Sequence, residues 1–143
     1  MEHILVPVDF SPDSEKALVV AAAEAHLRNA KVTLLHVVET FTPQDLELYP
    51  AIINEDNSGR ESEAKERLKE IGAKYFATVP YETMVKRSVG SVYSEIVSIE
   101  SELPVSLIVI SAHSRTFFEK LFLESTASKV VNASKSPVLV VPV

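Results

Sequence analysis

The chain has 143 residues, of which 46% are hydrophobic and 24% are charged, and its formal net charge at pH 7 is -6. This length suits one domain with a real core and is too short for two, so we expect a single domain over residues 1–143. An acidic chain with scattered Lys and Arg argues against nucleic acid and anionic membranes as partners, because both require a basic face.

Three absences in the sequence point to a cytoplasmic protein. The chain has no cysteine, which excludes disulfides and thiol chemistry and fits a reducing compartment. Its apolar runs are far shorter than the roughly 20 residues of a membrane span. Its N-terminus carries no export signature. We therefore expect a cytoplasmic location and no membrane partner.

Strand-like and helix-like segments alternate along the chain. Short runs rich in β-branched and aliphatic residues predict five strands, at residues 3–8, 31–38, 82–88, 105–110 and 137–143. The segments between them predict four helices, at residues 12–29, 58–75, 90–103 and 125–134. Ser11 suits the N-cap of the first helix and Pro12 its first position. Residues 40–57, with Pro43 and Pro50, are predicted to form the longest loop.

The second predicted helix is strongly charged and has one apolar stripe. The stripe has spacings of four, three and four residues and consists of Ala64, Leu68, Ile71 and Tyr75. On the opposite face, the i,i+4 spacing predicts ion pairs between Glu61 and Lys65 and between Glu63 and Arg67. The helix is therefore expected to pack on one side only.

Four of the five predicted strands are near-continuously apolar, and only residues 82–88 are weaker. Strands that are buried on both faces have this pattern, because a parallel sheet is covered by helices on both sides. Together with the alternation of strands and helices, it predicts an α/β fold with a single doubly wound, mainly parallel sheet.

The segment after the fourth strand has the layout of a phosphate-binding loop between a buried strand and a helix. It begins with ISAHSR at residues 110–115, and EST at residues 124–126 precedes the last helix. Such loops use glycine, because backbone amides can surround a phosphate only where side chains stay out of the way. Ser111, Ser114 and Glu124 stand at the positions where glycine would be required.

Four short motifs occur in a fixed order along the chain. They are VPVDFS at residues 6–11, LLHV at residues 34–37, Gly90 at the start of the third helix, and SPVLVV at residues 136–141. This ordered set resembles the universal stress protein (UspA) family over essentially the whole chain. The resemblance implies a Rossmann-like sheet of five strands in the order 3-2-1-4-5, as in adenine nucleotide alpha hydrolases. The carboxyl ends of strands one and four should then flank a crevice.

The resemblance also implies a nucleotide pocket in this crevice. Nucleotide-binding members carry Gly-x-x-Gly, nine residues and Gly-Ser/Thr, and only Ser125 keeps that pattern here. The implied pocket residues are Pro7, Val8, Asp9, Val37, Ile110, Ser111, Ser114, Glu124, Ser125 and Thr126. The Glu124 carboxylate would repel phosphate by on the order of 4 kcal/mol per pair of unit charges near a surface. We therefore expect no tightly bound cofactor, with ATP as the alternative ligand.

Several candidate functional residues have an alternative structural role. Asp9 is suited to contact a ribose or a metal-bound phosphate. It is equally suited to a structural role in a turn before the first helix. His36 is predicted to be a core histidine and His113 to face the crevice. Ser125 fits a helix cap better than a nucleophile or a phosphorylation site. The four histidines lack metal-ligand spacing and no Ser/His/Asp set can be placed, so we expect no metal and no catalytic residues.

These observations predict a stress-response protein that is not an enzyme and acts by binding a protein or small-molecule partner. Two alternatives remain open at this point. One is an ATP- or AMP-binding switch, in which the serine-containing loop still holds nucleotide. The other is an enzyme with weak phosphatase or ATPase activity, which only the fold supports.

The fifth predicted strand suggests how two copies would assemble. In the order 3-2-1-4-5 it is a sheet edge, and it is apolar on both faces, which invites pairing with another chain. The residues of the predicted interface are Val138, Leu139, Val140 and Val141. Antiparallel pairing across a two-fold axis gives a closed homodimer. The alternative is a monomer whose edge is covered by residues 40–57.

Overall fold

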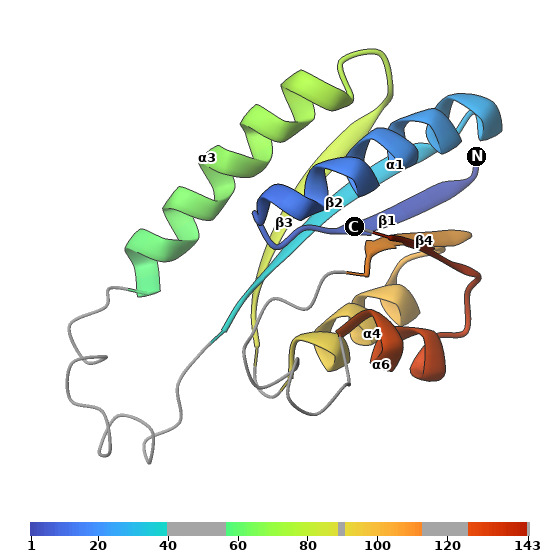
Figure 1. Ribbon diagram of the computed structural model, residues 1–143. Coiled ribbons are helices and arrows are strands. Elements are labelled where there is room, and N and C mark those ends of the chain that lie inside the picture. Colours follow the sequence, from blue (N-terminus) through green and yellow to red (C-terminus); the bar gives the residue numbers. More distant parts are fainter. Residues whose placement is uncertain (40–56, 89–90, 113–125, 143) are drawn as a thin grey trace.

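The computed structural model describes residues 1–39, 57–88, 91–112 and 126–142 (Figure 1). Within these ranges the chain forms one sheet of five strands in the order β3-β2-β1-β4-β5, and every pair of neighbouring strands is parallel. The strands are β1 His3–Pro7, β2 Lys31–Val38, β3 Tyr81–Arg87, β4 Leu107–Ser111 and β5 Val138–Val141. The predicted fold class and strand order are confirmed.

Helices cover both faces of this sheet. They are the 3-10 helix η1 Pro12–Ser14 and the α-helices α1 Glu15–Arg28, α3 Asn57–Tyr75, α4 Val92–Glu102 and α6 Thr126–Ala133. Helices α1 and α3 lie on one face, and α4 and α6 lie on the other (Figure 1). The predicted helices and strands are therefore present, with ends shifted by a few residues at most. The predicted loop over residues 40–57 lies almost wholly outside the described residues.

At the start of the first helix, Ser11 lies at the predicted position, but its side chain makes a different hydrogen bond from the one expected of an N-cap. Ser11 occupies the N-cap position of η1 but makes no side-chain cap hydrogen bond. Its hydroxyl instead donates to Oδ1 of Asp9 at 2.7 Å, because a charged carboxylate two residues earlier is a strong acceptor. At the other end of α1, Asn29 has φ 53° and ψ 47°, the left-handed conformation in which helices commonly end.

Strand β2 separates the two halves of the core. Its side chains alternate between the faces of the sheet, so that Leu34 packs in the cluster under α1 and α3, whereas Leu35 and Val37 pack in the cluster under α4. His36 is 8% exposed, and its Nδ1 donates to the carbonyl oxygen of Val8 at 2.7 Å. The prediction that His36 is a core histidine is confirmed.

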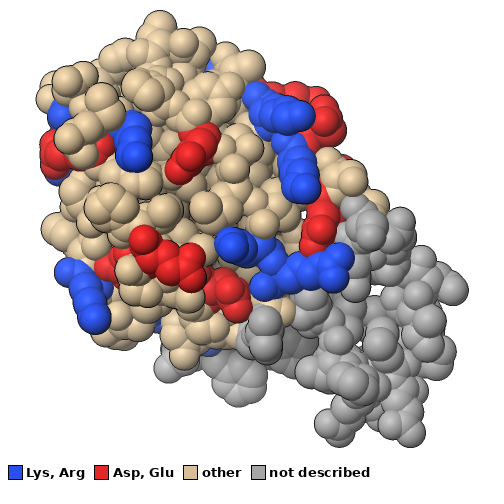
Figure 2. Space-filling model, turned by 180° about the vertical axis from the view of Figure 1, so that it is seen from behind, with Lys and Arg blue, Asp and Glu red and all other residues tan. Residues whose placement is uncertain are grey.

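One face of the molecule shows how the charged side chains of its described residues are distributed. On the face shown in Figure 2, Lys and Arg alternate with Asp and Glu, and the described part of this face has no continuous basic surface. No helix within the described ranges is long and apolar enough to cross a membrane.

Candidate ligand-binding site

A recess lies at the carboxyl ends of the central strands, on the side of the sheet covered by α4 and α6. The empty space in it, open solvent included, is about 570 Å³, but only about 50 Å³ can hold the centre of a water-sized sphere. It is lined by Pro7, Val8, Asp9, Ser14, Leu35, Val37, Val92, Ile96, Ile110, Ser111 and Thr126. Strands β1 and β4 both end here. The order of the strands reverses at this point, since β2 and β3 lie on the far side of β1 and β5 lies on the far side of β4. This crevice is where open parallel sheets bind ligands.

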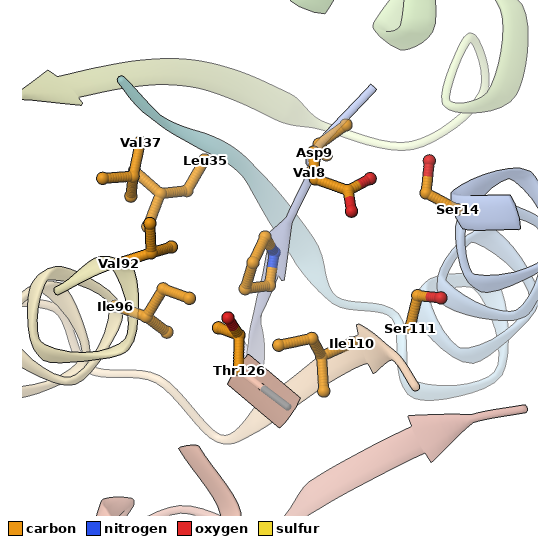
Figure 3. A pocket seen from close by; sticks show the side chains of 11 residues that line it. Val8, Asp9, Ser14, Leu35, Val37, Val92, Ile96, Ile110, Ser111 and Thr126 are labelled. Carbon is orange, nitrogen blue, oxygen red and sulfur yellow. The ribbon is translucent and has the colours of Figure 1, made fainter. Parts of the chain in front are cut away.

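One side of this crevice is an aliphatic wall. Leu35 and Val37 of β2 and Val92 and Ile96 of α4 lie beside one another on one side of the recess (Figure 3). Such a wall can cover the faces of a flat ring, because it offers only methyl and methylene groups.

The other side of the crevice carries oxygen atoms. Asp9 contributes a carboxylate there, and Ser14 and Ser111 contribute hydroxyls (Figure 3). The Ser14 hydroxyl already donates to the carbonyl oxygen of Ser11 at 2.7 Å. Asp9 is the only ionisable side chain among the described lining residues. The described part of the site therefore suits a ligand with one apolar and one hydroxylated end, and offers no cation to a phosphate.

The β1–η1 loop sets the position of Asp9. Its Oδ1 accepts hydrogen bonds from the backbone nitrogen of Ser11 at 2.9 Å and from the hydroxyl of Ser11 at 2.7 Å. The turn uses only this one oxygen, while the carboxylate also lines the crevice. The structural and the ligand-binding roles predicted for Asp9 are thus compatible with each other.

Most of the pocket residues implied by the sequence meet in this recess. Those that line it are Pro7, Val8, Asp9, Val37, Ile110, Ser111 and Thr126. Ser114, Glu124 and Ser125 lie outside the described residues, as does His113. A role in nucleotide binding stays a prediction for each of these residues.

Four lining residues were missed by the sequence analysis, although the sequence held a signal for them. Leu35 lies two residues before Val37, and positions i and i+2 of a strand share a face. Val92 and Ile96 are i,i+4 neighbours at the start of α4 and share a face of that helix. Ser14 is the last residue of η1 and the N-cap residue of α1, and it carried no comparable signal.

A metal centre finds no support in the described part of the chain. No group of three or more His, Cys, Asp or Glu residues is gathered there in a way that could hold a metal ion.

A doubly wound parallel sheet with a crevice between β1 and β4 defines the class of Rossmann-like α/β proteins. Within this class, the model of the universal stress protein family matches residues 1–142. The chain belongs to the universal stress protein family.

Similar proteins cover nearly the full chain. Universal stress protein MJ0577 of Methanocaldococcus jannaschii is 28% identical, covering 98% of this chain and 94% of its own. The solved structure of MJ0577 has a TM-score of 0.77 and covers 99% and 96% of the two chains. Universal stress protein C of Salmonella typhimurium is 30% identical, covering 98% and 94%.

Solved structures of similar proteins include complexes with cAMP and with dAMP. The universal stress protein of Archaeoglobus fulgidus in complex with dAMP is 22% identical to this chain, covers 98% of it and 97% of its own chain, and has a TM-score of 0.62. At this identity the likeness supports the fold alone.

Proposed function

We propose that the chain is a cytoplasmic stress-response protein that acts by binding, without enzymatic activity and without tight binding of ATP. The observation that carries this proposal is the composition of the crevice. Its described lining holds one carboxylate, hydroxyls and aliphatic groups, and no cationic side chain. A triphosphate placed beside Asp9 would meet like charge, which opposes binding.

The loop sequence supports the same reading. Ser111, Ser114 and Glu124 occupy the positions where nucleotide-binding family members carry glycine. Serine side chains narrow the space available to a phosphate beside the backbone, and Glu124 adds a second negative charge. We therefore expect no tightly bound cofactor, and a small ligand or protein partner that lacks a phosphate chain.

A second candidate function is an ATP- or AMP-dependent switch. The aliphatic wall and the hydroxyl-rich side are what an adenosine group requires, and the Archaeoglobus fulgidus relative holds dAMP. In this case the hydroxyls of Ser111 and Ser114 would serve as phosphate ligands in place of backbone amides.

Calorimetric titration with ATP, ADP and AMP, with and without magnesium, separates the two candidates. We expect no saturable heat from ATP at micromolar protein. A low-micromolar dissociation constant, or ATP that co-purifies with the protein, would contradict the proposal. Val92→Trp is the matched control, because the half-buried Val92 lies in the aliphatic wall and the larger ring would fill it. Heat that persists in this variant comes from another site.

We propose that the protein is a homodimer paired through β5. This strand is an edge of the sheet. Leu139 packs on the cluster under α1 and Val138 on the cluster under α4 and α6, while Val140 is 36% exposed. An exposed edge without charges favours pairing with another strand, and a second copy offers an identical one. The alternative is a monomer whose edge is covered by another part of the chain.

A further inference from the structure

Phe10, directly after Asp9, has an unusual backbone conformation. Its φ is 62°, in the left-handed region that a bulky side chain rarely occupies. Such a conformation persists only where the surrounding contacts hold it in place. The contacts of Phe10 therefore show what fixes the loop that carries Asp9.

The Phe10 ring contacts two other side chains. The ring of His36 lies with the ring centroids 4.2 Å apart and the planes tilted by 31°. The guanidinium group of Arg67 of α3 lies over the Phe10 ring, 4.2 Å from its centroid. Stacked contacts of these kinds are favourable, the second as a cation–π interaction.

The same two residues also hold the backbone on either side of Asp9. His36 Nδ1 donates to the carbonyl oxygen of Val8 at 2.7 Å. Arg67 Nη2 approaches the carbonyl oxygen of Phe10 at 3.5 Å. The residues before and after Asp9 are thus each held by a side chain from another element of the fold.

Neither His36 nor Arg67 lines the crevice. His36 lies on the α1 and α3 face of β2, because its neighbours Leu35 and Val37 pack on the other face. Arg67 belongs to α3, which covers that same face (Figure 1). The Asp9 loop is therefore held from the side of the sheet opposite to the ligand site.

We propose that His36, Phe10 and Arg67 form a clamp that positions the Asp9 carboxylate for ligand binding, with Arg67 as the positioning residue that links α3 to the crevice. The inference rests on the proposed binding function of the crevice. It makes α3, a helix that contributes no side chain to the crevice lining, a determinant of ligand affinity.

Hydrogen exchange measured by NMR tests the clamp without any ligand. The reporter is the amide of Ser11, which donates to Asp9 Oδ1, and the reference is the amide of Val32, which donates to the Pro80 carbonyl in the sheet at 2.9 Å. For Arg67→Ala we expect the exchange rate at Ser11 to rise about three- to fivefold relative to that at Val32. This is the factor that corresponds to the free energy of one exposed cation–π contact. Lys69→Ala is the matched control on α3, since Lys69 is exposed and pairs only with Glu66 among the described ion pairs.

A second variant separates the ring from the backbone strain. Phe10→Gly relieves the left-handed conformation but removes the stacked ring, and we expect faster exchange at Ser11. Slower exchange in Phe10→Gly would overturn the clamp. An equal rise at Ser11 and Val32 in Arg67→Ala would also overturn it, because that result indicates a general loss of stability.

Millimolar adenosine, which carries no phosphate to be repelled by Asp9, then links the clamp to binding, with the methyl resonances of Val37 and Ile110 as probes. We expect Arg67→Ala to weaken adenosine binding by the same three- to fivefold factor. Unchanged affinity beside raised exchange at Ser11 would overturn the link to the ligand. A wild type that gives no response to adenosine would contradict nucleoside binding at the crevice, whereas the exchange ratios would still decide whether the clamp exists.

Discussion

Glu100 of α4 is a buried acidic residue that holds the turn before β5. Its side chain is buried, at 6% exposed. Its Oε1 accepts hydrogen bonds from the Ser134 hydroxyl at 2.8 Å, the Lys135 amide at 2.8 Å and the Ser136 amide at 2.6 Å. These three donors form the turn between α6 and β5. Replacing the carboxylate should therefore loosen the strand that we propose as the dimer interface.

The expected cost of Glu100→Gln follows from these contacts. Hydrogen bonds to a charged group contribute about 1.5–3 kcal/mol each, but three bonds to one oxygen do not add fully. The amide oxygen of glutamine still accepts without charge, so we expect a loss of about 2 kcal/mol in the free energy of unfolding at pH 7. For a chain of this length this loss lowers the Tm by roughly 7 °C.

The effect should depend on pH. Burial raises the pKa of Glu100, but the hydrogen bonds from Ser136, Ser134 and Lys135 lower it, and the net shift is downward. Its stabilising contribution is thus fully present above the ordinary glutamate pKa and is lost as the pH falls through the lowered folded value. Denaturant unfolding from pH 7 to pH 3 measures this change. Glu102→Gln, an exposed neighbour on the same helix, is the control. An effect of Glu100→Gln that is independent of pH, or equal to that of the control, would refute the reasoning.

Three further predictions follow from the site, the edge strand and a buried histidine. Glu124→Gly should improve ATP affinity more than either serine-to-glycine change in the loop, and the triple change most; a folded triple variant that ignores ATP would contradict the residue mapping. Val140→Lys should shift the mass found by light scattering from dimer toward monomer, whereas Leu27→Lys on exposed α1 should not. Burial and the charge of Lys31 lower the pKa of His3 below 6.5, so His3 should stabilise the fold above pH 6.5 and lose this contribution as the pH falls through the lowered value. Unfolding free energies of wild type and His3→Gln that change in parallel from pH 7 to pH 4 would exclude that role.

The fold class was predictable because the composition of the strands indicates a sheet that is covered on both faces. A run such as ILVPV at residues 4–8 is apolar at nearly every position, which indicates a strand buried on both faces. Strand order did not follow from these runs but from the resemblance to a family. The same resemblance implied that Val37 and Ile110 lie in the crevice, and both residues line the recess.

Contacts between distant parts of the chain were not predictable. Glu61, expected to pair with Lys65 within its helix, forms an ion pair with Arg87 of β3. Arg67, expected to pair with Glu63, lies over the ring of Phe10. Local spacing gives the neighbours on one helix, but partners from other elements compete for the same side chains. The left-handed Phe10 carried no signal either, because such positions are ordinarily inferred from glycine.

The two sides of the crevice differ in how much they reveal about function. Leu35, Val37, Ile96 and Ile110 of the recess also belong to the buried cluster between the sheet and α4 and α6. These residues would be needed for folding even if no ligand ever bound, so an intact aliphatic wall does not distinguish a nucleotide switch from a protein that ignores nucleotide. Asp9 is different, because the next residue, Phe10, has a backbone φ of 62° that a bulky side chain rarely adopts, and the proposed clamp would account for it. The polar side, which we propose is positioned from α3, is therefore where the function of this chain should be sought.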